Sequence, residues 1–513
     1  MAKKIKVGKF SLNMTDEVIT KVTREVLSLF GIAVAERGES VDFAELSVAH
    51  EIAAREPRVA IKTTVTLKHL DGTEQRSETT GYARDGEADR AAIHRLVKLN
   101  FYRLAREMLS LPPAPWGILH GVRPSKIVHR YIDDGMNRED IISRLADDYD
   151  VGCEKAELLT DIAFYERPFL SETDERTVSV YVGIPFCLTR CLYCSFPSVI
   201  LPSDDVLDEF MRTFEMDMRT AAQSIREHGF KVQSIYVGGG TPTSLPERYF
   251  ARMMDLVTES FYQTSLGGKK GTVEFTVEAG RPDSITKEKL RTMAAHRVTR
   301  VSVNPQTMRD STLRRIGRAH TAADIVKMYH EVRETGIPSI NMDLIIGLPG
   351  EDERDVAYTM SEIKKLAPDD VTLHALALKR GSDLKTNLML GAMENNLPDD
   401  DTARRMYSVA MDGIHDMGLT PYYLYRQGYQ SGQLENIGCA KRGHESMYNI
   451  QIMEERQTII GVGGAATTKV VNPATGRLKA TFNPKDLKTY LEKISLYIDK
   501  RKNLIDESYG FVK

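Results

Sequence analysis

The sequence predicts an α/β protein in which a partial (β/α)6 barrel forms the core, preceded by a small α/β module and followed by an α+β region. Three observations favour this fold class. From residue 178 onward, short apolar runs alternate with long amphipathic helical patterns, as in parallel sheets with helical crossovers. The residues before that point mix strand and helix patterns in a different order. At 513 residues, the chain is also long enough for two or three hydrophobic cores.

The N-terminal α/β module is expected over residues 1–112, and a helical linker region over 113–172. Apolar periodicity in the module predicts two helices and two strands rich in β-branched residues. In chain order these four elements are 16–30, 41–50, 58–68 and 87–109. In the linker region, three short helical patterns cover 125–134, 137–149 and 155–164.

The barrel core is expected over residues 173–385, and a C-terminal domain over 386–513. Six apolar runs predict parallel strands at 178–183, 234–237, 271–278, 298–303, 339–346 and 370–377. Amphipathic patterns between them predict helices that include 205–228, 287–296, 322–335 and 353–366. The C-terminal domain should begin with a helix at 400–417, continue with shorter strands and loops, and end with a helix at 484–501.

The composition is typical of a water-soluble protein, with 42% hydrophobic residues, 27% charged residues and a formal net charge of −3. This balance argues against nucleic-acid and membrane-surface proteins, which are usually basic, but leaves room for a local basic pocket. No apolar core follows the charged start MAKKIKVGKF, so no secretory signal is expected. No apolar run approaches the roughly 18 residues of a membrane span. We therefore expect a cytoplasmic protein.

Three of the five cysteines, Cys187, Cys191 and Cys194, lie within eight positions directly after the first predicted barrel strand. In a reducing compartment such a cluster indicates metal binding rather than disulfides. A [4Fe–4S] cluster held wholly by protein takes four thiolates, so three leave one iron open for a substrate or cofactor. A zinc site would need a fourth ligand, which the loop does not supply. The spacing therefore predicts a [4Fe–4S] cluster with one open iron.

Other polar residues follow the ends of later predicted strands. Gly238–Thr243 (GGGTPT) has the glycines that let backbone N–H groups approach a ligand, although a simple tight turn is the alternative. Glu278, Gln306 and Asp343 follow successive strands, and Arg318 is expected in the next helical segment. Taken singly, Glu278 or Arg318 would be interpreted as a surface charge. Together they predict a site at the carboxyl ends of the strands, where catalytic groups of β/α barrels gather.

These motifs, in this order, resemble the oxygen-independent coproporphyrinogen III oxidase (coproporphyrinogen dehydrogenase) family of radical S-adenosylmethionine (radical SAM) enzymes. The matching segments are YVGIPFCLTRCLYC, VGGGTPT, VEA and DLIIGLPGE, together with Gln306 and Arg318. The resemblance covers residues 178–377 well and the C-terminal region more loosely. Segments 116–124 and 448–455 are similar to a divergent branch of the family that carries a long N-terminal extension.

The resemblance implies a radical SAM barrel, a [4Fe–4S] cluster on the three cysteines, and S-adenosylmethionine (SAM) bound to that cluster with a second SAM beside it. It further implies that a 5′-deoxyadenosyl radical removes hydrogen from a propionate, which then loses CO₂ and an electron, so that coproporphyrinogen III becomes protoporphyrinogen IX. Matching positions that would contact the first SAM are Tyr181, Gly239 and Glu278. Positions that would line the second are Tyr193, Gly240, Thr241, Gln306, Arg318, Asp343 and Ala377.

The partners implied are a small tetrapyrrole substrate and an electron donor such as flavodoxin or ferredoxin, with no nucleic acid. Four propionates should meet cationic groups, because arginine forks suit carboxylates. The candidates are Lys379, Arg380, Arg426 and the run 441–444 (Lys-Arg-Gly-His), each with a surface charge as the alternative. Alanine at Arg380 or Arg426 is then expected to raise the Michaelis constant for a propionate substrate.

Two departures from the best-known dehydrogenases keep other functions open. Phe196 stands where they carry a fourth cysteine, and Gly183 where they carry histidine. The related haem chaperones also lack that cysteine, but residues 435–440 here lack their histidine and aromatic signature. A haem-binding chaperone, or a radical methyl transfer that opens the haem ring, therefore remains an alternative function.

Three further features are interpreted without a role in catalysis. Cys439 is a candidate haem ligand but is more simply a small buried hydrophobe. Cys153 is also expected to be a small buried hydrophobe. The glycine-rich segment 460–466 fits either a wall over the site or tight packing.

Overall fold

The computed structural model describes residues 5–36, 38–55, 58–171, 174–262, 274–379, 381–390, 396–427 and 431–510. The chain divides into two compact units, 1–161 and 162–513. Each unit is considered by itself.

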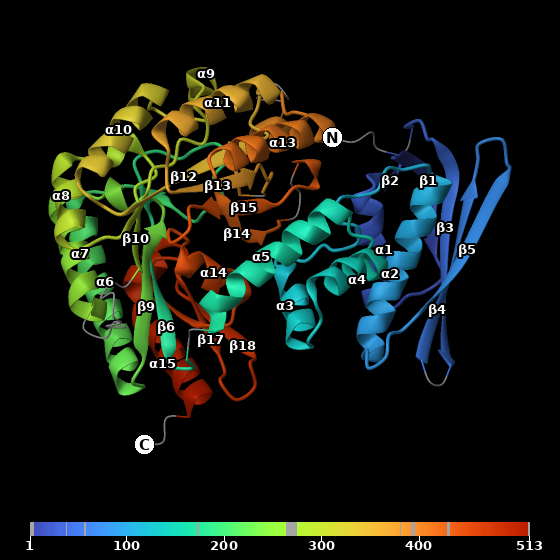
Figure 1. Ribbon diagram of the computed structural model, residues 1–513, viewed down its shortest axis with the longest axis horizontal. Helices are drawn as coiled ribbons and strands as arrows, with labels where there is room; N and C mark the ends of the chain where they lie inside the picture. The colour runs from blue at the N-terminus through green and yellow to red at the C-terminus, as the bar shows by residue number, and fades with distance from the viewer. Residues whose placement is uncertain are drawn as a thin grey trace. The chain divides into compact units, whose positions relative to one another are not determined.

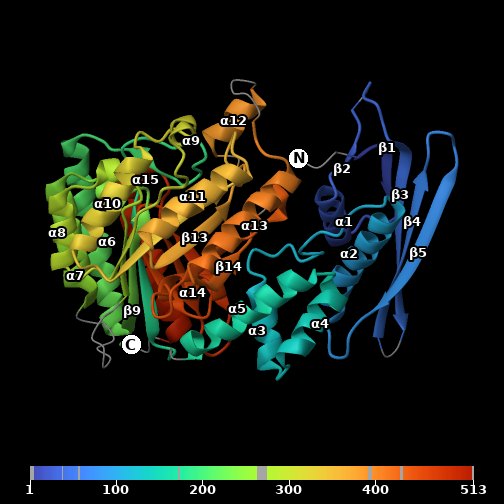
Figure 2. The same ribbon diagram turned by 45° about the horizontal axis from the view of Figure 1, so that its top comes forward.

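The first unit is built on a five-stranded sheet with the order β2-β1-β3-β4-β5. Strands β1, β2 and β3 pair in parallel, whereas β3, β4 and β5 form an antiparallel meander. Helices α1 and α2 cover one face of this sheet (Figure 2). The elements are β1 (Ile5–Leu12), α1 (Glu17–Leu29), β2 (Ile32–Val34), β3 (Phe43–Arg55), β4 (Arg58–Lys68), β5 (Glu74–Tyr82), α2 (Asp89–Met108), α3 (Ser125–Asp133) and α4 (Arg138–Tyr149).

The structure adds three strands to the two expected in this unit. Strand β5, EQRSETTGY, buries none of its side chains. Its residues are mostly polar, so the sequence has no apolar run to mark this strand. Strand β1, IKVGKFSL, buries only Val7. Both are held by backbone pairing to neighbours that carry the core, which includes Leu46 and Val65. Helix α5 (Cys153–Ser171) is longer than the predicted 155–164.

The second unit contains an 11-stranded sheet with the order β14-β15-β13-β12-β11-β10-β9-β6-β16-β17-β18. All six predicted barrel strands are present in it and pair in parallel, in the predicted sequence. They are β6 (Thr177–Ile184), β9 (Lys231–Gly239), β10 (Glu274–Glu278), β11 (Arg300–Ser302), β12 (Ser339–Ile346) and β13 (Asp370–Ala375). The predicted α/β fold class, with six parallel strands and their helices in a partial (β/α)6 barrel, is confirmed.

Helices pack on the outer side of these strands, as α7, α8, α10 and α11 show in Figure 1. Aspartate or threonine caps fix where several of them begin; capping boxes formed by Asp352 with Asp355 and by Thr321 with Asp324 start α11 and α10. The helices are α6 (Asp204–Glu227), α7 (Glu247–Phe261), α8 (Lys287–Ala295), α9 (Asp310–Arg315), α10 (Ala322–Glu334), α11 (Glu353–Leu366), α12 (Asp383–Met389), α13 (Asp400–Asp416), α14 (Met447–Glu454) and α15 (Leu487–Tyr509).

The C-terminal strands extend both edges of the same sheet. β15 (Asn436–Ala440) adds antiparallel to β13, β14 (Thr420–Tyr425) adds antiparallel to β15, and β16 (Thr458–Gly463) adds parallel to β6. β17 (Thr467–Val471) and β18 (Leu478–Phe482) complete the second edge. Two short strands outside this sheet, β7 (Phe186–Cys187) and β8 (Val199–Ile200), pair with each other.

The glycine-rich segment 460–466 is a tightly packed strand end beside β6. A Cβ atom on Gly463 would lie 2.2 Å from the carbonyl oxygen of Gly183, and one on Gly464 would lie 2.8 Å from Cγ of Pro185. The fully buried Asp217 on α6 accepts hydrogen bonds from Gly463 N–H and pairs with Arg501 on α15 (Nη1–Oδ1 2.6 Å). This buried pair locks β16 onto the barrel beside the cysteine loop.

In the part of the chain that the structure describes, no helix combines the length and the apolar composition needed to cross a membrane.

Candidate active site

The three cysteines follow the carboxyl end of β6, as predicted: Cys187 ends the short strand β7, and Cys191 and Cys194 lie in the loop after it. Backbone hydrogen bonds shape this loop: Cys194 N–H donates to Cys191 O (3.0 Å), and Leu192 N–H donates to Ile316 O (3.1 Å). Cys191 is buried, and Cys187 and Cys194 are partly buried. Burial raises the pKa of the Cys194 thiol, and the neighbouring thiols of Cys191 and Cys187 raise it further. All three thiols open onto one cavity of about 380 Å³.

The glycine motif at the end of β9 packs directly against the cysteine loop. Gly240 N–H donates to Ile184 O (2.8 Å), and Thr241 N–H donates to Phe186 O (2.7 Å). Gly239 has φ +111°, and a Cβ atom on Gly240 would lie 2.5 Å from Phe186 O. A side chain at Gly240 would therefore push the two loops apart, which explains why the motif consists of glycines.

Glu278 ends β10 on the floor of this cavity. Its Oε1 accepts a hydrogen bond from the Tyr236 hydroxyl (2.7 Å). Burial raises the pKa of Glu278 to about 7, although the bond from Tyr236 lowers it in part. The carboxyl group therefore exchanges its proton near neutral pH and can accept a cationic or hydrogen-bond-donating ligand.

Gln306 and Arg318 present buried polar atoms to the cavity. Gln306 has a left-handed backbone (φ +67°) and lies between β11 and α9. Arg318 was expected in a helical segment but lies in the loop after α9. Its Nη1 donates to Gly280 O (2.8 Å) and its Nη2 to the Tyr193 hydroxyl (3.0 Å). Gln306 Oε1 and Arg318 Nε are buried without a hydrogen-bond partner among the described residues. Buried polar atoms without a partner indicate a site for a polar ligand.

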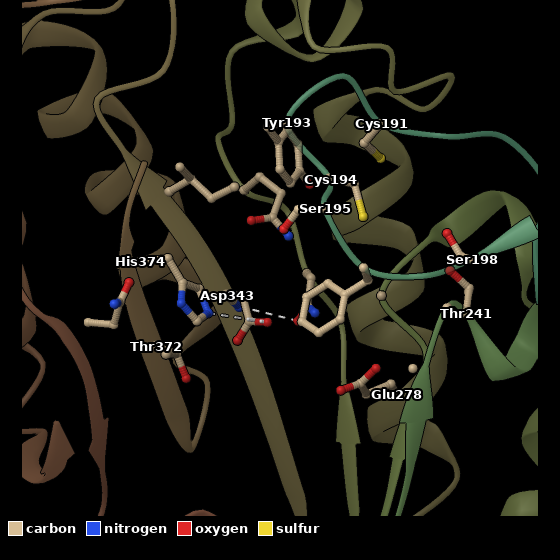
Figure 3. A pocket seen from close by; sticks show the side chains of 18 of the residues that line it. Cys191, Tyr193, Cys194, Ser195, Ser198, Thr241, Glu278, Asp343, Thr372 and His374 are labelled. Carbon is tan, nitrogen blue, oxygen red and sulfur yellow. Dashed lines mark hydrogen bonds and ion pairs between the residues drawn. The ribbon is translucent and has the colours of Figure 1, made fainter. Parts of the chain in front are cut away.

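Asp343 on β12 and His374 on β13 face one another across the cavity from the cysteines (Figure 3). His374 Nε2 lies 3.7 Å from Asp343 Oδ2, and His374 Nδ1 lies 3.3 Å from the Tyr425 hydroxyl. Burial alone would raise the pKa of Asp343, but the contact with His374 and a hydrogen bond from Asn341 hold it below its usual value. Asp343 is therefore a carboxylate at neutral pH.

Every predicted cluster and SAM residue lines this one cavity. The set is Tyr181, Cys187, Cys191, Tyr193, Cys194, Gly239, Gly240, Thr241, Glu278, Gln306, Arg318, Asp343 and Ala377. Their roles as ligands or contacts remain predictions, but their shared location is a structural finding.

Of the predicted cationic groups that the structure describes, one lines the cavity and the others do not. Lys379 lines the cavity, and Arg380 lies outside the described residues. Arg426 is buried, bonds to Gln433 O, and does not line the cavity. The 441–444 run follows Ala440, which pairs with the first residue of β13, so it lies at the opposite end of the strands. Arg426 and this run are therefore not supported as substrate-binding groups.

Several residues that line the cavity were not predicted from the sequence. His374 interrupts an apolar strand as Asp343 does, and that signal could have identified it. Arg281, two residues after Ala279 in the VEA motif, carries no signal in the sequence that separates it from other loop charges. Helix α14 contributes Asn449 and Met453 to the cavity wall, and its Tyr448 stacks on Tyr236 with ring centroids 4.5 Å apart.

Two smaller predictions also have outcomes. Cys439 is fully buried in β15, as expected of a small hydrophobe, but Cys153 is exposed at the start of α5, so its predicted burial was wrong. Gly183 has a structural reason: a Cβ atom there would lie 2.4 Å from Gly464 O. Histidine at this position would displace the glycine-rich strand end.

The donor set fits an iron–sulfur cluster better than a zinc ion. A structural zinc ion takes four protein ligands, and the cysteine segment supplies three thiols. The cavity beside them is lined by Gln306 and Arg318, whose Oε1 and Nε atoms are buried without a hydrogen-bond partner among the described residues. Three thiols next to such polar atoms suit a four-iron cluster with one open iron and a polar cofactor beside it.

Comparisons with known proteins agree with this arrangement. Residues 181–363 match the model of the radical SAM superfamily. The oxygen-independent coproporphyrinogen-III oxidase-like protein HemZ of Bacillus subtilis is 39% identical over 399 residues, 77% of each chain. The heme chaperone HemW of B. subtilis is 29% identical over 288 residues, 56% of this chain and 70% of HemW. The structure is similar to that of coproporphyrinogen III oxidase HemN from Escherichia coli, a radical SAM enzyme, with a TM-score of 0.51 at 20% sequence identity. The match covers 68% of this chain and 82% of HemN and shows a common fold.

Proposed function

Because the chain belongs to the oxygen-independent coproporphyrinogen-III oxidase-like family of radical SAM proteins, we propose that it converts coproporphyrinogen III to protoporphyrinogen IX. Members of the superfamily use a [4Fe–4S] cluster and SAM. When bound, these cofactors supply a 5′-deoxyadenosyl radical that removes a hydrogen atom. In this reaction each of two propionates would lose one hydrogen atom, one CO₂ and one electron, and become a vinyl group. The electron would pass to an external one-electron acceptor of the iron–sulfur or flavin class.

The observation that carries this proposal is that one cavity joins the three thiols to two groups of polar residues. One group, Tyr181, Gly239 and Glu278, lies on β6, β9 and β10. The other includes Gln306, Arg318 and Asp343, which line the same cavity. Holding reactants in a fixed geometry and excluding water are the tasks a protein performs when its cofactor supplies the reactive species. We assign the first group to the cluster-bound SAM and the second to a further SAM.

Charged and aromatic residues that line the cavity suit a tetrapyrrole with carboxylate side chains. Arg190 and Lys379 line it and are exposed, and Arg190 Nη2 is held by Gly381 O (2.7 Å). Phe196, 61% exposed, lines the cavity beside them. Cations for the propionates and an aromatic ring for the macrocycle are the groups such a substrate needs. We propose that these three residues receive the substrate, and that flavodoxin or ferredoxin supplies electrons.

A haem chaperone is the second candidate, favoured by the HemW relatives. The structure offers an argument against it in residues 435–440. Glu435 and Cys439 have no exposed surface, and Asn436 is used in a hydrogen bond from Ala375 N–H (3.0 Å). Of this stretch only Asn436 lines the cavity, and residues 435–440 lack the histidine and aromatic rings of the chaperone signature, so the decarboxylase is preferred.

The deciding experiment uses the full chain with its cluster reconstituted without oxygen. Reductant, SAM and coproporphyrinogen III are added, and vinyl products, CO₂ and 5′-deoxyadenosine are measured. We expect vinyl products and CO₂ in proportion to the SAM consumed.

Two outcomes would overturn this proposal. Uncoupled 5′-deoxyadenosine together with stable haem binding would favour the chaperone. A methylated or ring-opened product from haem would place the chain with other tetrapyrrole-modifying radical enzymes. Lys379→Gln serves as the substrate-side variant: it should raise the Michaelis constant for coproporphyrinogen III while leaving SAM binding unchanged.

A further inference from the structure

Arg281 is a buried cation in the turn after β10, with only 3% of its surface exposed. Two of its nitrogens bind one carboxylate: Nε lies 3.0 Å from Asp283 Oδ1, and Nη2 lies 2.8 Å from Asp283 Oδ2. A bidentate pair of this kind fixes the plane of the guanidinium group. The third nitrogen, Nη1, is therefore aimed in a fixed direction.

That direction is the cysteine loop. Nη1 donates to the carbonyl oxygen of Thr189 (2.9 Å) and also to the Sγ atom of Cys191, at 3.9 Å. Thr189 lies between Cys187 and Cys191, so one side chain joins the end of β10 to the loop and to one of its sulfur atoms. The neighbouring Arg318 has a different set of partners, which includes Gly280 O and the Tyr193 hydroxyl.

A hydrogen bond to a ligand sulfur has a known physical effect on an iron–sulfur cluster. Reduction adds negative charge, which spreads onto the thiolates, and an N–H group or a cation beside them stabilises the reduced form. Residues that orient and tune the ligands in this way act without touching the metal. Asp283 opposes the effect, because its negative charge partly cancels that of Arg281.

We propose that Arg281 is a positioning residue that holds the cysteine loop and raises the reduction potential of the cluster through Cys191, and that Asp283 limits this rise. The inference rests on the cluster assignment and not on the identity of the substrate. It predicts that neutralising the two members of the pair shifts the potential in opposite directions.

The test measures the midpoint potential of the cluster in the full-length protein, reconstituted without oxygen and titrated with a reductant while its electron paramagnetic resonance signal is followed. In Arg281→Gln, the potential should become more negative. At a fixed potential the ratio of reduced to oxidised cluster should fall roughly tenfold, which for one electron is about 59 mV. In Asp283→Asn the potential should become more positive.

Opposite shifts separate a specific effect from a loosened site. A loop that merely loosens would let in water in both variants and move both potentials the same way, so shifts of one sign would overturn the proposal, as would no shift in Arg281→Gln. Arg281→Lys keeps the charge with fewer donors and should show a smaller negative shift, and it replaces Arg281→Gln if that variant does not fold.

Arg333→Gln is the matched control. It also removes an arginine from an arginine–aspartate pair (Arg333 Nη2–Asp369 Oδ2 2.6 Å), but one at the other end of the strands, so the potential should not change. Failure of the cluster assignment would look different, because the wild-type chain would then hold no four-iron cluster at all.

Discussion

In the unit of residues 162–513, the parallel strands carry buried charged residues at their amino ends and at their carboxyl ends. The charged residues at the two ends differ in their surroundings. At the amino ends, Arg300 Nη1 lies 2.5 Å from Asp370 Oδ2, which also accepts from the Tyr422 hydroxyl. Asp369 is likewise bound by Arg333 and Lys441. At the carboxyl ends the polar side chains face a cavity instead. Internal pairing stabilises a fold, whereas polar atoms left facing a cavity indicate a ligand.

Pairing within the protein is also the reason that a cationic residue in the sequence does not by itself indicate a substrate site. Lys441 pairs with Asp369, and His444 Nδ1 lies 2.6 Å from the Ser339 hydroxyl. Their charges and donors already have partners in the protein. Lys379, at the other end, faces the cavity.

The largest effect is expected from removing the thiols at the carboxyl end. Replacing Cys187, Cys191 and Cys194 together by alanine should abolish iron binding, the brown colour and SAM cleavage, because no thiolate would remain to hold the cluster. Iron analysis and absorbance spectra measure this, with Cys439→Ala, a buried cysteine in β15, as the control that should keep its iron. Retained iron in the triple variant would refute the cluster assignment.

The next largest effect should appear at the amino end, in stability alone. Arg300→Met leaves Asp370 buried and unpaired, which should lower the free energy of unfolding by about 3–5 kcal/mol. Denaturant unfolding of the apoprotein measures the loss. Arg333→Gln, whose side chain is 30% exposed, should cost only about 1 kcal/mol or less. Equal losses would contradict the distinction between the buried Arg300 and the partly exposed Arg333.

At the carboxyl end, Glu278→Gln should stabilise the apoprotein above neutral pH while weakening SAM binding. Burial raises the pKa of Glu278 from 4.5 to about 7, so between these values the folded state holds more protons than the unfolded state. Wild-type stability should therefore fall as pH rises through this range, by at most about 3 kcal/mol. The glutamine variant should lack this fall.

Unfolding curves at pH 5 and pH 8 measure the difference, and SAM titration on the reconstituted protein measures binding. A variant that is less stable than wild type at pH 8 would show that the carboxylate is stabilising, against its assignment as a ligand-binding group.

The smallest effect should come from His374→Phe. Loss of the imidazole beside Asp343 should raise the pKa of that carboxyl group and weaken SAM binding about fivefold, as for one hydrogen bond of about 1 kcal/mol. Titration calorimetry between pH 5 and pH 8 should show the loss growing toward low pH. Tyr425→Phe, which removes only the hydroxyl near His374 Nδ1, is the control with a smaller change. Unchanged SAM binding in both variants would remove this pair from the site.

Much of the barrel could be predicted because its signals are local. Strand β12 and helix α11 have the predicted limits, since apolar runs and caps mark them within a few residues. Strand β5 could not be predicted, because its polar residues form a strand only by pairing with β4.

The site shows the same division. The amino-acid sequence by itself determined the cysteine spacing, the position of the glycine-rich motif, and the order of the polar residues at successive strand ends. Only the tertiary structure decided that Arg281 points at Cys191, that His374 faces Asp343, and that the 441–444 run lies at the wrong end. The physical reason is that these facts depend on where a charge finds its partner, and the partners lie far apart in the chain.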